Sequence, residues 1–256
     1  MIVDTHCHLF EMKKYSLPED VYPVVVGYSH GSNKKVVEIS RRINPNSDPK
    51  TKQKTNYPIV LGIAPQTALK ENANEAKLDE WVEFIKKNNP NAIGEVGLDY
   101  KWAQTTADLE KQMMVFKKMI ETADEMKLPI VIHSRNNPNE NEVPKNAIDL
   151  IIEMLGKRKY LMHFYSGNDE QAKRILEMGG YISIMALHSK DRRKVIENTP
   201  MDRLMVESDC PYVGKSPEAS IDAAKYIAEV KNLDFEEVAA QTTKNAMKFF
   251  DFEISK

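Results

Sequence analysis

Short apolar runs recur along the chain and alternate with longer segments of helical periodicity. Eight of these runs are apolar almost throughout, which is typical of parallel strands buried on both faces. They lie near residues 1–5, 22–28, 57–64, 92–96, 129–133, 159–163, 181–185 and 203–207. Because parallel neighbours need a crossover connection, usually a helix, the alternation predicts an α/β fold.

The segments between the runs carry apolar residues at helical spacing, as Leu78, Trp81, Val82 and Ile85 do within 75–88. The same spacing predicts further helices at 107–127, 144–155, 168–178, 217–231 and 235–250. Pro144 suits a first helical turn, Asn168 suits a cap, and Gly156 and Gly179 suit helix ends. Residues 9–21 lack a convincing amphipathic pattern, so we predict a loop as the first crossover.

Eight strands alternating with helices over 256 residues predict a (β/α)₈ TIM barrel. We expect a single domain spanning residues 1–256, with a reduced first crossover and an extra C-terminal helix. Active sites of such barrels lie where the strands end, at their carboxyl face. The polar residues that directly follow the apolar runs are therefore the candidates for chemistry.

Composition narrows the class of protein. The chain has 36 basic and 38 acidic residues, which excludes an overall polybasic binder. Residues 33–54 carry seven basic and two acidic residues, a pattern typical of a solvated helix and loop or of a surface that binds phosphates.

Cys7 and Cys210 lie too far apart to suggest a disulfide scaffold, and we expect both to pack in the interior. No signal peptide or apolar span is evident, so we expect a cytoplasmic protein without a membrane partner.

Six polar residues stand at predicted strand ends. His6 and His8 are two apart, so a strand would turn both imidazoles to one side. The others are Glu95, His133, His163 and Asp209. Each alone could cap a helix or bond a loop amide, but together they favour a metal site. Four imidazoles and two carboxylates exceed the ligands of one tetrahedral zinc ion. They indicate two divalent ions, which could be zinc, manganese, magnesium or iron.

The order of these ligands resembles the amidohydrolase superfamily. The segments DTHCHL, GEVGLDY, VIHSR, MHFYSG and VESDCPYV resemble, more closely, the TatD family of metal-dependent deoxyribonucleases. The resemblance implies that His6, His8 and Asp209 hold one metal, that His133 and His163 hold a second, and that Glu95 bridges them. It also implies phosphodiester hydrolysis by a metal-bridged hydroxide, with Asp209 as general base and Glu95 as the other catalytic carboxylate.

Four further residues receive roles in this interpretation. Arg135 could clamp a phosphate or form a loop salt bridge, and His188 could contact substrate. Glu207 and Asp99 could orient the histidine ligands.

Two departures from the family pattern keep the substrate open. The usual G-x-H-P after strand 3 is Gly62-Ile63-Ala64-Pro65 here, so a histidine near the substrate phosphate is absent. The loop at 136–142 is polar and unlike the usual helix start. The expected substrate is DNA, with a small amide, lactone or phosphoester as the alternative. A metal-bound, non-catalytic binding module is a third possibility.

Overall fold

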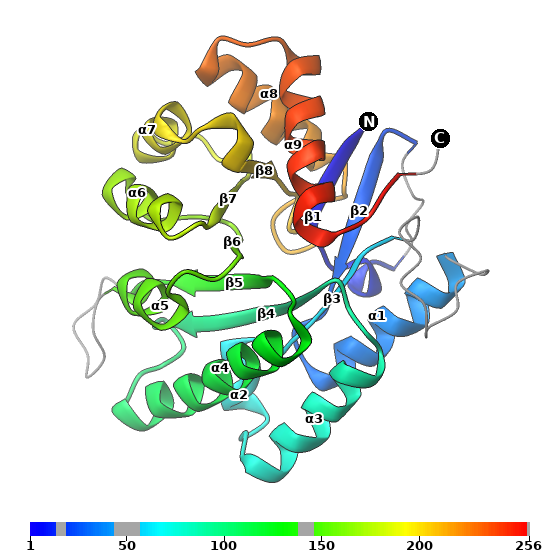
Figure 1. Cartoon of the computed structure of the whole chain (residues 1–256), viewed down its shortest axis with the longest axis vertical. Helices are drawn as coiled ribbons and strands as arrows, with labels where there is room; N and C mark the ends of the chain where they lie inside the picture. Colours follow the sequence, from blue (N-terminus) through cyan, green and yellow to red (C-terminus); the bar gives the residue numbers. More distant parts are fainter. Residues whose placement is uncertain (14–18, 44–56, 138–145, 255–256) are drawn as a thin grey trace.

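The computed structural model describes residues 1–13, 19–43, 57–137 and 146–254. Eight parallel strands form one sheet in the order in which they occur along the chain (Figure 1). The strands are β1 (Ile2–Cys7), β2 (Val21–Val26), β3 (Ile59–Leu61), β4 (Ala92–Asp99), β5 (Ile130–Arg135), β6 (Tyr160–Met162), β7 (Tyr181–Ile184) and β8 (Leu204–Val206). A parallel bridge between Cys7 and Cys210 brings the last strand back to the first, so the sheet forms a nearly closed barrel.

Helices lie around the outside of this barrel (Figure 1). They are α1 (His30–Ile43), α2 (Pro65–Lys70), α3 (Glu75–Lys87), α4 (Thr106–Met126), α5 (Ala147–Leu155), α6 (Asp169–Glu177), α7 (Lys190–Asn198), α8 (Ala219–Lys231) and α9 (Phe235–Phe250). Two 3₁₀ turns, η1 (Leu9–Glu11) and η2 (Met201–Arg203), complete the described elements. Each of the described helices is too short or too polar to cross a membrane.

The predicted barrel and its eight strands are confirmed. Three strands continue past their predicted ends: β1 to Cys7, β4 to Asp99 and β5 to Arg135. In the first crossover, the described part of residues 9–21 has only the turn η1 before β2. That the chain is one domain stays a prediction.

Most predicted helix ends are also confirmed. Asn168 forms a capping box with Gln171 at the start of α6, and Gly156 caps the end of α5. The start of α5 was predicted too early: Asn146 caps it, and Pro144 lies outside the described residues. Three helices were not assigned from apolar spacing, namely α1, α2 and α7. In α7 the reason is physical, because only Val195 and Ile196 are buried and the pattern is weak.

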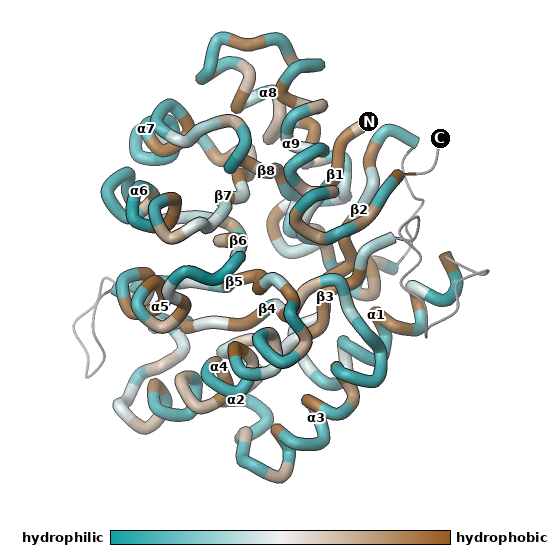
Figure 2. The backbone as a smooth tube through the Cα atoms, in the orientation of Figure 1, coloured by the Kyte–Doolittle hydropathy of each residue, from teal (hydrophilic) through white to brown (hydrophobic). Residues whose placement is uncertain are grey.

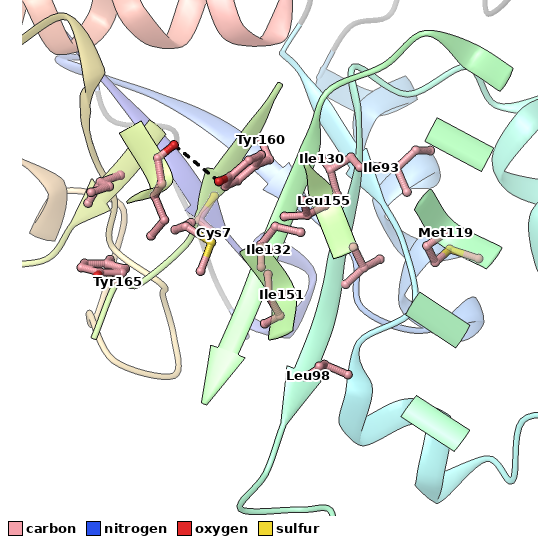
Figure 3. Close-up of a cluster of buried hydrophobic side chains, with 14 of the residues drawn as sticks. Cys7, Ile93, Leu98, Met119, Ile130, Ile132, Ile151, Leu155, Tyr160 and Tyr165 are labelled. Carbon is pink, nitrogen blue, oxygen red and sulfur yellow. Dashed lines mark hydrogen bonds between the residues drawn. The ribbon is translucent and has the colours of Figure 1, made fainter. Parts of the chain in front are cut away.

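Apolar side chains form two separate groups, one on each side of the sheet. The inner group fills the barrel with alternate strand residues, such as Val3, Val131 and Leu161, and includes Phe249 and Phe250 of α9. The carbonyl of Phe250 accepts a bond from Asn91, just before β4, so α9 closes the amino-terminal end of the barrel. The outer group lies between strands and helices (Figure 3). Figure 2 shows how hydrophobic and hydrophilic residues alternate along the backbone of these helices.

The basic segment 33–54 is described only as far as residue 43. Its first part belongs to α1, in which Val36, Val37 and Ile39 are buried. Arg41 and Arg42 are exposed, and Arg42 pairs with Glu38 one turn earlier. This part is a solvated helix face, while residues 44–54 lie outside the described residues.

Candidate metal centre

Two bulged strands turn His6 and Glu95 toward the barrel axis. Between Asp4 and Cys7, β1 has one more residue than β2 has between their partners, and β4 has one more than β5 between Ile93 and Val96. An extra residue of this kind reverses the alternation of side chains. Val3 accordingly belongs to the inner apolar group, whereas Cys7, four residues later, belongs to the outer one.

The same reversal occurs in β4, where Ala92 lies in the inner group and Val96 in the outer. A regular strand would place both on one face and would direct Glu95 outward. The bulge instead brings the Oε2 atom of Glu95 to 3.6 Å from the Nε2 atom of His6. Bulges are common beside active sites because they re-aim a side chain in this way.

His6, His8 and Asp209 form the first cluster of candidate ligands. The Nε2 atoms of His6 and His8 are 3.2 Å apart, and Oδ1 of Asp209 lies 3.5 Å from Nε2 of His8. Two donors bound to one ion at about 2.05 Å and a tetrahedral angle would be about 3.3 Å apart. The observed spacing therefore matches the ligand spacing around a single ion.

His6, Glu95 and His163 form a second cluster that shares His6 with the first. The rings of His6 and His163 are stacked with their centroids 3.5 Å apart. His133 reaches this cluster through Glu95, because its Nδ1 atom lies 2.6 Å from Oε1. The six predicted ligands are thus brought together, with Glu95 between the two groups.

Two of the histidines each contact a further carboxylate. Oδ2 of Asp99 is 2.9 Å from Nε2 of His133, and Oε1 of Glu207 is 3.0 Å from Nδ1 of His163. Both carboxylates are fully buried. This is the arrangement in which a second carboxylate fixes the ring orientation and tautomer of a metal-binding histidine.

Gln66 is a contact that the sequence did not reveal. Its side-chain nitrogen donates to Asp99 at 2.8 Å and lies 3.1 Å from Nε2 of His133. Gln66 belongs to no recognised motif, and only its place in the first turn of α2, two residues after Ala64, could have indicated it. Ala64 itself is buried before α2.

The residue before Asp209 is held by Asp4, in the first strand. Oδ1 of Asp4 accepts from the backbone of Ser208 at 2.8 Å, and Oδ2 accepts from its hydroxyl at 2.6 Å. The Asp209 amide also donates to the carbonyl of His6 at 2.9 Å. These bonds join the end of β1 to the segment after β8, so they fix Asp209 relative to His6 and His8.

Burial and neighbouring charges shift the pKa values of the clustered groups in different directions. Burial, then the neighbouring His163, lowers the pKa of His6 to about 3. Burial disfavours charge on His133 too, but Asp99 and Glu95 outweigh it and raise its pKa to about 10. In His163, Glu207 outweighs burial and the pKa rises to about 9. Burial opposes ionisation of Glu95, yet the hydrogen bonds from His133 and His6 keep its pKa well below the usual range.

These features fit divalent cations. The buried cluster contains the carboxylates of Glu95, Asp99, Glu207 and Asp209. Concentrated buried negative charge is costly unless it is compensated, either by charged His133 and His163 in metal-free protein or by divalent cations when these rings are neutral ligands. His6 Nε2 is directed at other ligand atoms, and a mixed set of imidazole and carboxylate donors suits zinc, manganese or iron.

The two predicted substrate residues lie farther out. Arg135 is exposed at the end of β5, two residues beyond His133. His188 is exposed after β7, and its ring packs on Tyr226 with centroids 4.0 Å apart. No described contact joins the side chain of either residue to the ligand cluster.

Both cysteines are buried and free, as predicted. Cys7 lies among the outer apolar side chains (Figure 3), where its thiol donates to the carbonyl of Val24 at 3.3 Å. It therefore faces away from the ligands.

An eight-stranded parallel barrel with imidazoles and carboxylates at its carboxyl end is an arrangement suited to a metal-dependent hydrolase. Comparison with known proteins leads to the same class. The family model described as "TatD related DNase" matches residues 3–251. The chain belongs to this family.

Several relatives are similar over long stretches. The chain is 35% identical to an uncharacterized metal-dependent hydrolase, YabD, of Bacillus subtilis (strain 168), over 66% of this chain and 69% of that protein. It is 29% identical to deoxyribonuclease TATDN3 of Homo sapiens, over 97% of this chain and 94% of that one. Because the family and its relatives are metal-dependent hydrolases, the chain is an enzyme of this kind. A non-catalytic binding module is thereby disfavoured.

Solved structures share the fold. A TatD family hydrolase from Entamoeba histolytica superposes with a TM-score of 0.77 at 20% identity, covering 97% of each chain. An uncharacterized amidohydrolase from Saccharomyces cerevisiae also gives 0.77, at 15% identity, over 97% of this chain and 99% of that one. These likenesses support the barrel fold.

Proposed function

We propose that this protein hydrolyses phosphodiester bonds in DNA with two divalent metal ions. The observation that carries the proposal is the convergence of four imidazoles and two carboxylates in one buried cluster at the carboxyl ends of the strands. The family assignment and the name of the human relative support DNA as the substrate.

His6, His8 and Asp209 would hold one ion. Glu95 and His163, with His133 beside them, would hold the other. Glu95 is suited to bridge the two sites, because Oε1 faces His133 at 2.6 Å while Oε2 faces His6 at 3.6 Å and His8 at 3.9 Å. When bound, such ions act as Lewis acids on a phosphoryl group and make water more acidic.

Other roles in the proposed reaction fall to individual carboxylates of the chain. Asp209 is 7% exposed at the carboxyl end of the barrel, where its carboxylate could accept a proton from an attacking water. The depressed pKa of Glu95 keeps it anionic over the working range, which a bridging ligand requires. Asp99 and Glu207 would orient His133 and His163.

Two exposed residues are proposed to contact substrate. Arg135, at the end of β5, has a guanidinium suited to a phosphate oxygen. His188, beyond β7, is exposed and packs on Tyr226, and would contact another part of the substrate.

The alternative substrate is a small amide, lactone or phosphoester. Ala64 favours it, because a buried methyl group stands where family members usually carry a histidine near the substrate phosphate. The metal cluster itself is compatible with either substrate class.

The test is hydrolysis of end-labelled single-stranded DNA by protein reconstituted with Mn²⁺ or Mg²⁺. Glu95→Ala removes the central carboxylate, and Glu110→Ala, on the exposed face of α4, is the matched control. We expect metal-dependent cleavage that is lost in Glu95→Ala and kept in Glu110→Ala. No cleavage by the metal-loaded wild type, together with turnover of a small ester or amide, would replace DNA by the alternative.

A further inference from the structure

Three aromatic rings surround His8 at one rim of the metal centre. Phe10, Tyr28 and Tyr212 pack edge-on against its imidazole, with centroids 5.8, 5.4 and 5.1 Å away. They follow β1, β2 and β8, so they come from three strand ends at the carboxyl face. We call these three residues the aromatic rim.

Tyr212 is the exposed member of the rim. Its residue is 58% exposed, whereas Phe10 and Tyr28 are partly buried. A single exposed aromatic residue is common on protein surfaces, but this one belongs to a group of three rings at the carboxyl end of the barrel, where ligands bind in this fold. Tyr212 therefore has ring surface to offer to a ligand.

The ring of Tyr212 is also held in place. Its hydroxyl donates to that of Tyr28 at 3.0 Å, and the Tyr28 hydroxyl donates to Glu11 at 3.1 Å. The backbone of the next residue, Val213, donates to the carbonyl of Asp209 at 2.9 Å. Because one turn carries both Asp209 and Tyr212, the position of the ring is fixed relative to a candidate metal ligand.

We propose that Tyr212 stacks on the nucleobase next to the scissile phosphate. This inference rests on the proposed DNA hydrolysis and names a determinant of its specificity. A phosphate at the cluster would lie beside His8, and the centroid of the Tyr212 ring is 5.1 Å from that imidazole, in an edge-on arrangement. Stacking is tolerant of sequence, because every base has a π-face. Tyr28 and Glu11 act as positioning residues for the ring.

The test is a coupling experiment between the ring and the base. The substrates are short single-stranded oligonucleotides with one cleavable phosphodiester between methylphosphonate linkages. One substrate is complete, and two others lack the base on the 5′ or the 3′ side of the cleavable bond. Wild type, Tyr212→Ala, Tyr212→Phe and Val213→Ala are compared with Mn²⁺ present.

We expect Tyr212→Ala to lower kcat/KM on the complete substrate by about 5- to 150-fold, mainly through KM. On one of the two abasic substrates the same substitution should have almost no effect. Tyr212→Phe keeps the ring and should keep most of this coupling, and Val213→Ala, in the same exposed turn, should resemble wild type.

The outcomes separate this inference from the proposed function. Cleavage by wild type with an equal Tyr212→Ala effect on all three substrates would overturn base stacking and leave DNA hydrolysis intact. Equal kcat/KM for Tyr212→Ala and wild type would overturn it too. If the metal-loaded wild type cleaves none of the DNA substrates, both proposals fail.

Discussion

Asp4 offers a sharp test of how the site is held together. It is fully buried, and its two carboxyl oxygens bind the amide and hydroxyl of Ser208, more than two hundred positions later in the chain. The hydroxyl of Ser208 in turn accepts from the amide of Cys210 at 3.1 Å. Replacing Asp4 by alanine would remove the link between the first strand and the segment carrying Asp209.

The expected cost follows from the groups left unpaired. Asp4→Ala leaves the amide and the hydroxyl of Ser208 unpaired in the interior, at about 1–3 kcal/mol for each, and also removes the longer, 3.3 Å bond from the amide of His6. Burial, and then Cys210, raises the pKa of Asp4 well above its usual range, so removing this carboxyl recovers part of its own burial cost. The net destabilisation should be about 2–5 kcal/mol, which corresponds to a fall in Tm of about 4–20 °C.

The assay is chemical and thermal unfolding of metal-free protein, followed by titration with Mn²⁺. Asp4→Asn keeps an acceptor for the Ser208 amide, so it should cost about 1 kcal/mol. Asp222→Ala, an exposed aspartate on α8, should change the free energy of unfolding by less than about 0.5 kcal/mol. In Asp4→Ala, Mn²⁺ should bind at least about tenfold more weakly, because Asp209 loses its support.

The argument is refuted if Asp4→Ala unfolds within about 1 kcal/mol of wild type and binds Mn²⁺ equally well. A loss of stability with unchanged Mn²⁺ affinity would show that Asp209 is positioned by its other contacts, such as the bond from its amide to His6.

Three further predictions follow from the cluster and the barrel. In metal-free protein, His133 and His163 have pKa values of about 10 and about 9, so both rings are charged at about pH 7.5. Because only a neutral ring can bind metal, metal binding should release up to about two protons, and the metal affinity should increase as pH rises. Calorimetry in buffers of different ionisation enthalpy checks this, and buffer-independent heats would contradict it. Glu207→Gln should weaken metal affinity by about 10- to 100-fold, measured by competition with a chelating dye, and unchanged affinity would remove its orienting role. Phe250→Ala, at the opposite end of the barrel, should lower the free energy of unfolding in denaturant by about 3–5 kcal/mol, while the folded protein keeps its metal affinity. A loss of metal affinity would contradict this prediction and show that the two ends of the barrel depend on each other.

The sequence was sufficient for the barrel because its strands bury both faces. Runs such as Ile130-Val131-Ile132 contribute Val131 to the inner apolar group and the two isoleucines to the outer one, so they must be apolar throughout. A continuous apolar run of this kind can be recognised from one sequence alone. Helices were harder to predict where few residues are buried, as in α7, because only two of its residues need to be apolar.

The six candidate ligands could be selected from the sequence because each stands at or directly after a predicted strand, and the structure brings their side chains close together. That they bind metal stays a prediction. The contacts around them were partly found: Asp99 and Glu207 lie beside His133 and His163, as predicted, whereas Gln66 and Asp4 were given no role. Gln66 approaches Asp99 across 33 positions and Asp4 reaches Ser208 across 204, and a spacing pattern carries no information on such pairings.

The bulges mark a deeper limit of pattern reasoning. The spacing of His6 and His8 predicts that both face one way, but it does not say which face of the sheet that is. Counting regularly from Val3, which lies inside the barrel, would direct both histidines outward and Cys7 inward. The extra residue in β1 reverses this, and the extra residue in β4 does the same for Glu95. Two one-residue insertions in the ladder therefore decide whether the ligands converge on the barrel axis or on the helices. Because each costs a ladder pairing, the barrel gives up local strand regularity where the metal centre requires it.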